Sequence, residues 1–180
     1  MPDKLDSLTP TTLKVLEFFF ADSRAEYHER EVIRRAKISK GSANKILRHL
    51  ASLALLIRTQ KGRMVFYRLN EGDPRVKQLK ILNNVWTLRG FVVENEERTR
   101  KMILFGSSAE GMDIGESDFD ILILGDHKTI LKESISRFNQ KNSRKISPII
   151  LDMDEFVKMK REDKPLFERI DRGIILWETA

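Results

Sequence analysis

The stretch DFDILIL, residues 118–124, constrains the fold most, because two aspartates stand one residue apart at the head of an apolar run. A short, continuous apolar run predicts a buried strand. Side chains alternate along a strand, so Asp118 and Asp120 are expected on one face and Phe119 on the other. Two adjacent carboxylates raise each other's proton affinity unless a cation lies between them. The pair therefore predicts a site for Mg²⁺ or Mn²⁺, ions that combine carboxylates with water and phosphate oxygens.

A glycine-rich segment, FGSSAEG, precedes this strand along the chain. It follows a second predicted strand, Lys101–Phe105, and residues 106–111 predict a tight turn that opens a helical turn. Glycine lets backbone N–H groups approach a phosphate closely, and a serine hydroxyl adds a donor. Gly106 and Ser107 are thus candidate nucleotide-binding residues, beside Asp118 and Asp120 as candidate metal-binding and catalytic residues. The alternative is an ordinary turn followed by a surface strand with two solvated aspartates.

Helical and strand patterns alternate through the rest of the chain. A helix is expected over residues 126–142, with Ile130, Leu131, Ile135 and Phe138 inward. A strand is expected over 145–151, a helix broken near Pro165, and a last strand in GIILWE. This order predicts an α+β domain over residues 99–180, built on a small mixed β-sheet with flanking helices.

The combination of GSSAEG, a spacer and SDFDILIL resembles the signature of the minimal nucleotidyltransferases in the DNA polymerase beta superfamily. The resemblance implies Mg²⁺-dependent transfer of a nucleoside monophosphate from an NTP, ATP being the first candidate, to a hydroxyl. It implies that Gly106 and Ser107 hold the triphosphate while Asp118 and Asp120 hold the metal. Active members place a third carboxylate on the strand after the first long helix. The matching place here is about Ser147, and the loss of a general base typically costs about 10²- to 10⁴-fold in rate.

Other charged residues near these motifs have two interpretations. Asp113 and Glu116 would assist the metal, or they keep a loop solvated. Lys128, Arg144 and Lys145 would line the nucleotide pocket, or they are solvated ends of helices and strands. The sequence does not choose between these alternatives.

The excess positive charge lies in the first part of the chain. Residues 1–72 carry 14 Lys and Arg against 8 Asp and Glu, whereas residues 73–180 carry 19 of each. A basic module joined to a neutral one is typical of a nucleic-acid-binding domain, although a solvated basic face has the same composition.

Three helices and a hairpin are expected in this first part. Thr9 and Pro10 predict a helix start, YHEREVIRRA a second helix, and Ser39 the cap of a third over residues 40–53. LLIRTQKGRMVFYRLN then predicts a β-hairpin. The pattern resembles a winged helix-turn-helix, so residues 1–72 are interpreted as a domain that binds double-stranded DNA. Its expected DNA-binding residues are Lys40, Ser42, Asn44, Lys45, Arg48, Lys61 and Arg63.

Residues 73–98 predict one long helix that links the two domains, and it serves either for homodimerisation or for packing on the second domain. Two functions remain open for the whole chain. The first is a nucleotidyltransferase coupled to a DNA-binding winged helix. The second is a DNA-binding regulator or antitoxin-like protein that binds nucleotide or a partner, such as a toxin, without turnover. Either is expected in the cytoplasm, because the start MPDKLDSLTP is no signal peptide and no apolar run suits a membrane span.

Overall fold

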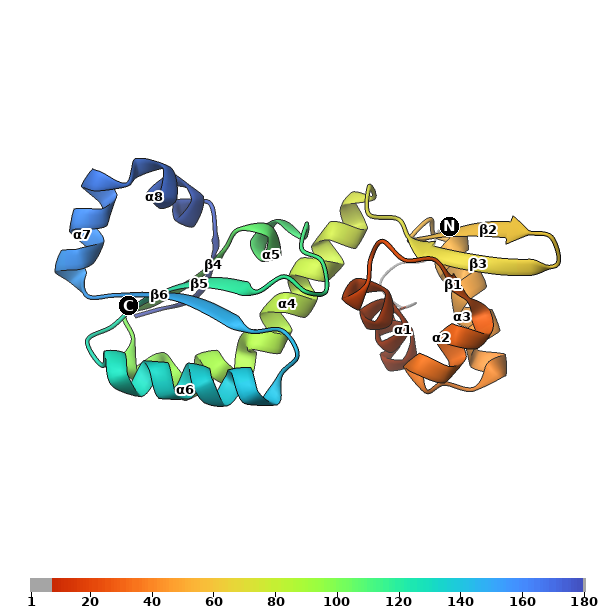
Figure 1. The fold of residues 1–180 in the computed structure, drawn as a ribbon, viewed down its shortest axis with the longest axis horizontal. Helices are drawn as coiled ribbons and strands as arrows, with labels where there is room; N and C mark the ends of the chain where they lie inside the picture. The colour runs from red at the N-terminus through yellow and green to blue at the C-terminus, as the bar shows by residue number, and fades with distance from the viewer. Residues whose placement is uncertain (1–7, 180) are drawn as a thin grey trace. The chain divides into compact units, whose positions relative to one another are not determined.

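The computed structural model describes residues 8–179 and divides the chain into two compact units (Figure 1). Unit 1 is Met1–Leu79 and unit 2 is Lys80–Ala180. Residues 1–7, where the sequence predicts no signal peptide, and residue 180 lie outside the described part. Within residues 8–179, no helix combines the length and the apolar character needed to cross a membrane.

Unit 1 combines three helices with a small antiparallel sheet. Thr9 caps the first helix, since its side chain accepts a hydrogen bond from the Thr12 N–H, and Ser39 caps the third in the same way through Ser42. In chain order the elements are α1 (Pro10–Ala21), β1 (Tyr27–His28), α2 (Glu29–Ala36), α3 (Lys40–Ser52), β2 (Leu56–Lys61) and β3 (Met64–Leu69). The three predicted helices and the hairpin are confirmed as elements.

One boundary of the second predicted helix was wrong. Tyr27 and His28 form a short strand that pairs with Tyr67 and Phe66 of β3, so that the sheet order is β1-β3-β2. Tyr27 is 4% exposed and donates a hydrogen bond from its hydroxyl to Asp22 at 2.6 Å. This long-range pairing overrides the local helical pattern, and Tyr27 and Tyr67 are buried in the core of the unit.

Helix α4 (Pro74–Asn95) begins in unit 1 and continues into unit 2, and a short 3-10 turn follows it. It ends three residues before the predicted limit at residue 98. The other elements of unit 2 are β4 (Lys101–Phe105), α5 (Ser107–Glu110), β5 (Phe119–Leu124), α6 (Lys128–Lys141), β6 (Ile146–Leu151), α7 (Met153–Glu162), α8 (Lys164–Asp171) and β7 (Ile174–Glu178). The α+β prediction for this part of the chain is confirmed.

The four strands of unit 2 form one mixed sheet in the order β6-β5-β4-β7. Only β5 and β6 run parallel; β4 is antiparallel to both β5 and β7. Helices α4 and α6 cover one face of this sheet, and α7 and α8 cover the other (Figure 1). Along β5 the side chains alternate as expected: Ile121 joins the core under α4 and α6, whereas Leu122 joins the core under α7 and α8. Asp120 therefore belongs to the α7/α8 face.

Helix α6 turns a slightly different stripe inward than the sequence predicts. Leu131 and Ile135 are buried as expected, but Ile130 is 43% exposed. Ser134 takes an inward position instead, where its hydroxyl accepts a hydrogen bond from Asn95 at 2.9 Å. A polar contact thus occupies part of the helix face that apolar spacing alone assigns to the core.

Candidate active site

Gly106 lies where the backbone leaves β4 and enters the short helix α5. Its φ of 69° and ψ of −156° belong to a region that side-chain-bearing residues avoid. A Cβ placed on this residue would lie 2.7 Å from the Oδ2 atom of Asp120, which is closer than real contacts allow. The positive φ favours glycine here, and a side chain at this position would also displace the Asp120 carboxylate.

The two aspartates differ in their surroundings. Asp118 is exposed and precedes β5, so the prediction that it belongs to the strand was wrong by one residue. Its carbonyl accepts a hydrogen bond from the Ser108 hydroxyl at 3.1 Å, which ties it to α5. Asp120 is partly buried, and burial raises its pKa; the charge of Arg169 opposes this and the charge of Asp118 adds to it.

Arg144 connects the separate pieces of this region. Its guanidinium donates from Nη2 to the Ser108 hydroxyl, from Nε to the Ser117 carbonyl and from Nη1 to Asp113 Oδ2, each at 2.8 Å. The same group lies 4.0 Å from the ring centroid of Phe119. One side chain thereby fixes the Gly-Ser turn, the loop after it and the start of β5 relative to one another.

Asp113 is the buried anion at the centre of this network, with 3% of its surface exposed. Asn84 donates from Nδ2 to its Oδ1 at 3.2 Å and to the Ser108 carbonyl at 3.0 Å. Lys80 donates to its carbonyl oxygen and lies 3.8 Å from its Oδ1. Asp113 is therefore an internal counter-ion that shapes the loop, and the two interpretations from the sequence, a metal ligand or a solvated loop residue, were both wrong.

The other charged candidates are engaged elsewhere. Lys128 pairs with Glu155 and, at 3.4 Å, with Asp152. Lys145 donates to the carbonyls of Asn139 and Asn142. Both side chains therefore have protein partners at helix and strand ends.

The position expected for a third carboxylate is fixed by the strand register. Ser147 on β6 pairs with Asp120 on β5 in the parallel ladder, so the two residues share one face of the sheet. The serine is exposed and carries no acid. Within residues 8–179, no group of three or more His, Cys, Asp or Glu side chains is arranged to hold a metal ion.

Sequence reasoning did not single out Arg169 on α8. Its Nη2 atom lies 3.8 Å from the point that a Cβ on Gly106 would occupy, beside the Asp120 carboxylate. About fifty residues separate Arg169 from the aspartates along the chain, so no local motif contains it. Only the packing of α8 on β4, through Ile170, brings it to this face.

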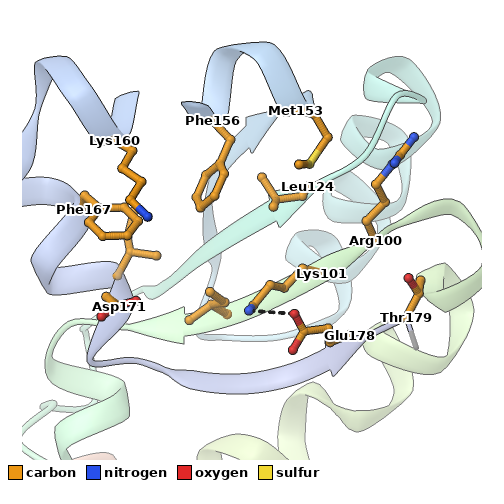
Figure 2. A pocket seen from close by; sticks show the side chains of 12 residues that line it. Arg100, Lys101, Leu124, Met153, Phe156, Lys160, Phe167, Asp171, Glu178 and Thr179 are labelled. Carbon is orange, nitrogen blue, oxygen red and sulfur yellow. Dashed lines mark hydrogen bonds and ion pairs between the residues drawn. The ribbon is translucent and has the colours of Figure 1, made fainter. Parts of the chain in front are cut away.

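A cavity of about 410 Å³ opens on the same face of the sheet, at the opposite end of β4 (Figure 2). Phe156, Phe167 and Leu124 line it, together with Lys101, whose ammonium group pairs with Glu178 at 2.8 Å. None of the predicted site residues lines this cavity. The candidate site beside Gly106 is therefore distinct from this cavity.

The residues predicted to bind DNA lie in unit 1. Lys40, Ser42, Lys45, Arg48 and Arg63 are exposed. Two other predicted contacts already have protein partners: Asn44 donates to Glu29 at 2.8 Å, and Lys61 pairs with Glu26. A second cavity, of about 360 Å³, lies between α1 and α3 and includes Ser42 and Lys45 in its lining.

The donor set around Asp120 suits a hard divalent cation. Mg²⁺ takes one or two carboxylates and completes its shell with water and phosphate oxygens. The exposed Asp118 and the partly buried Asp120 supply such a pair. A mixed sheet that carries a Gly-Ser turn against this pair defines a nucleotidyltransferase-type domain.

Residues 86–175 match the nucleotidyltransferase domain family, and this match spans half of the chain. The chain belongs to that family. No match was found among the curated proteins.

Two solved structures show weaker likenesses. A crystal structure of a candidate nucleotidyltransferase from Sulfolobus solfataricus is similar over 59% of this chain and 91% of its own, with 18% identity and a TM-score of 0.39. The crystal structure of human N-acetylserotonin methyltransferase in complex with SAM is similar over 49% of this chain and 29% of its own, with 20% identity and a TM-score of 0.32.

Proposed function

We propose that unit 2 is a Mg²⁺-dependent nucleotidyltransferase that moves a nucleoside monophosphate from an NTP, ATP being the first candidate, to a hydroxyl acceptor. One observation carries the proposal: the Oδ2 atom of Asp120 lies against Gly106, 2.7 Å from the point where a side chain would begin. The carboxylate suited to a metal therefore adjoins the turn suited to a phosphate. Membership of the nucleotidyltransferase domain family gives this contact its chemical meaning.

In the proposed reaction the acceptor oxygen forms a bond to the α-phosphorus while the bond from that phosphorus to its bridging oxygen breaks. Pyrophosphate leaves with the electron pair, and the hydroxyl proton passes to water, because Ser147 provides no carboxylate to take it. Asp118 and Asp120 would hold the metal, and Gly106 and Ser107 would hold the triphosphate. The metal would supply charge neutralisation at the reacting phosphate. Arg144 holds the Gly-Ser turn and the segment before β5 in a fixed arrangement, through its hydrogen bonds to Ser108 and Ser117.

We further propose that unit 1 is a winged helix-turn-helix that binds double-stranded DNA. Support comes from the net charge of +6 over residues 1–72 and from the exposed basic side chains of α3 and the hairpin. Phosphate contacts by Lys45, Arg48 and Arg63 would position the unit on the duplex. Binding of labelled duplex DNA to the whole protein, measured over a range of salt concentrations, tests this part.

The test of the enzyme is transfer of label from α-³²P NTPs. The protein is incubated with each nucleotide and Mg²⁺ or Mn²⁺, alone and with a cell extract, beside the double variant Asp118→Ala, Asp120→Ala. Labelled product that the double variant fails to make supports a nucleotidyltransferase. Arg137→Ala, on the opposite face of the sheet, is the control and should label as the wild type does.

A second function is favoured by one observation, the serine at the position opposite Asp120. A site with two carboxylates would still bind nucleotide and metal, and the chain would then act as a DNA-binding regulator or an antitoxin-like protein, with a toxin partner or a second copy as its target. Nucleotide binding without any labelled product, from a protein that binds DNA, would select this function over the enzyme.

A further inference from the structure

Helix α8 places a guanidinium beside the carboxylate of the candidate site. Ile170 packs into the core with Phe105 and Leu122 and holds the helix on the face of the sheet that carries Asp120. The Nη2 atom of Arg169 lies 3.8 Å from the point where a Cβ on Gly106 would be, and Asp120 Oδ2 lies 2.7 Å from that same point. The arginine, the aspartate and the glycine turn therefore share one small region of surface.

This guanidinium is available for a ligand. Arg169 is exposed, and among residues 8–179 no carboxylate lies within 4.0 Å of its nitrogen atoms. Its Cζ atom is 5.9 Å from the ring centroid of Phe105, a contact at the outer limit of a cation–π interaction. By contrast, Arg144 is already held by four acceptors in the buried network.

The charges of the site require a further cation when a nucleotide binds. A triphosphate brings several negative charges to a surface that already carries two aspartates, and a single divalent ion offsets only part of them. An arginine presents a planar fork of donors that matches two phosphate oxygens at once. Arg169 lies beside the turn proposed to hold the phosphates.

We infer that Arg169 is a nucleotide-contacting residue, whose guanidinium pairs with the β- or γ-phosphate of the triphosphate held at Gly106 and Ser107. The inference rests on the proposed function and extends it with a residue that lies outside the sequence motifs. On this inference, Arg169 distinguishes nucleotides by their number of phosphates and not by their base.

The experiment is titration calorimetry of the whole protein with ATP, ADP and AMP in the presence of Mg²⁺, for the wild type and for Arg169→Ala, Arg169→Gln and Arg169→Lys. We expect Arg169→Ala to weaken ATP binding about 10-fold or more, because it removes charge-assisted hydrogen bonds. The loss should be smaller for ADP and absent for AMP, and lysine should restore part of it. Arg137→Ala makes the same charge change on the opposite face and should bind all three nucleotides as the wild type does.

The outcomes separate this inference from the function on which it rests. Wild-type binding of ATP that Arg169→Ala and Arg169→Gln leave unchanged, in variants with wild-type thermal unfolding, overturns the inference alone. An equal loss for ATP and AMP also overturns it, since the residue would then contact the base, the sugar or the α-phosphate. Tighter Mg²⁺ binding by Arg169→Ala with unaltered ATP binding would overturn it too, because the arginine would be a counter-ion of Asp120. No binding of any triphosphate by the wild type overturns both proposals.

Discussion

Replacing Arg144 by alanine should destabilise unit 2 severely. The substitution removes four hydrogen bonds, each 2.8 Å long, to Asn84, Ser108, Ser117 and Asp113. It leaves the buried Asp113 carboxylate with less compensation. Removing one partner of a buried ion pair costs about 3 to 5 kcal/mol. Lys80 stays 3.8 Å from the carboxylate, so we expect the lower end, about 3 kcal/mol. For a unit of about 100 residues, each 1 kcal/mol lowers Tm by roughly 4 to 8 °C, which predicts a fall of roughly 12 °C or more.

The assay follows tryptophan fluorescence during thermal and urea unfolding. Both tryptophans of the chain, Trp86 and Trp177, lie in unit 2, so the signal reports that unit alone. The matched control is Arg137→Ala, because Arg137 is half exposed and its ion pair with Glu94 is a surface pair worth less than about 1 kcal/mol.

Two further variants identify the cause of the loss. Arg144→Lys keeps the charge but loses the fork of donors, so its Tm should lie between those of the wild type and Arg144→Ala. Adding Asp113→Asn to Arg144→Ala should recover stability, since the uncompensated charge is removed. A Tm for Arg144→Ala within about 3 °C of that for Arg137→Ala would correspond to less than about 1 kcal/mol. That result would show that the Arg144 network does not hold the loop.

Three other predictions concern Asp120, Gly106 and the hairpin of unit 1. Because burial raises the pKa of Asp120, the folded state binds its proton more tightly than the unfolded state, and stability from this group is lost as the pH rises through the folded pKa. Asp120→Asn should therefore raise Tm at neutral pH in metal-free buffer, an advantage that shrinks as the pH is lowered; a lower Tm at neutral pH would contradict this. Gly106→Ala should abolish ATP binding in calorimetry, because its Cβ would meet Asp120 Oδ2 at 2.7 Å, and wild-type affinity would show that the turn holds no phosphate. Arg63→Ala should reduce the salt dependence of DNA binding by about 0.9 in the slope of log K against log salt, and an unchanged slope would remove this residue from the phosphate contacts.

Local patterns predicted most of the elements of the fold. The apolar run after Asp118 predicted strand β5, and the glycine turn marked the end of strand β4. Pro165 indicated the break between α7 and α8. The same alternation placed Asp120 and Phe119 on opposite faces, and the packing of β5 confirms the alternation, since Phe119 and Leu122 join different cores. Periodicity carries this information because it reflects which side of an element is buried.

What the sequence did not predict depends on contacts between distant residues. In the sequence, Asp113 does not differ from an ordinary acidic loop residue. Its buried role depends on hydrogen bonds from Asn84 and Arg144, which lie 29 and 31 positions away. Arg169 reaches the site through the packing of a helix near the end of the chain. Likewise, Tyr27 left its predicted helix to pair with a strand 40 residues further on.

The parallel register between β5 and β6 places residue 147 directly beside Asp120. Whatever side chain stands there is delivered to the face of the sheet on which Asp120 lies, without any change in the backbone. Ser147→Asp would therefore turn a pair of carboxylates into a trio by a single exchange at an exposed site. If this one substitution increases turnover, then a single side chain separates a nucleotide-binding protein of this fold from an efficient catalyst.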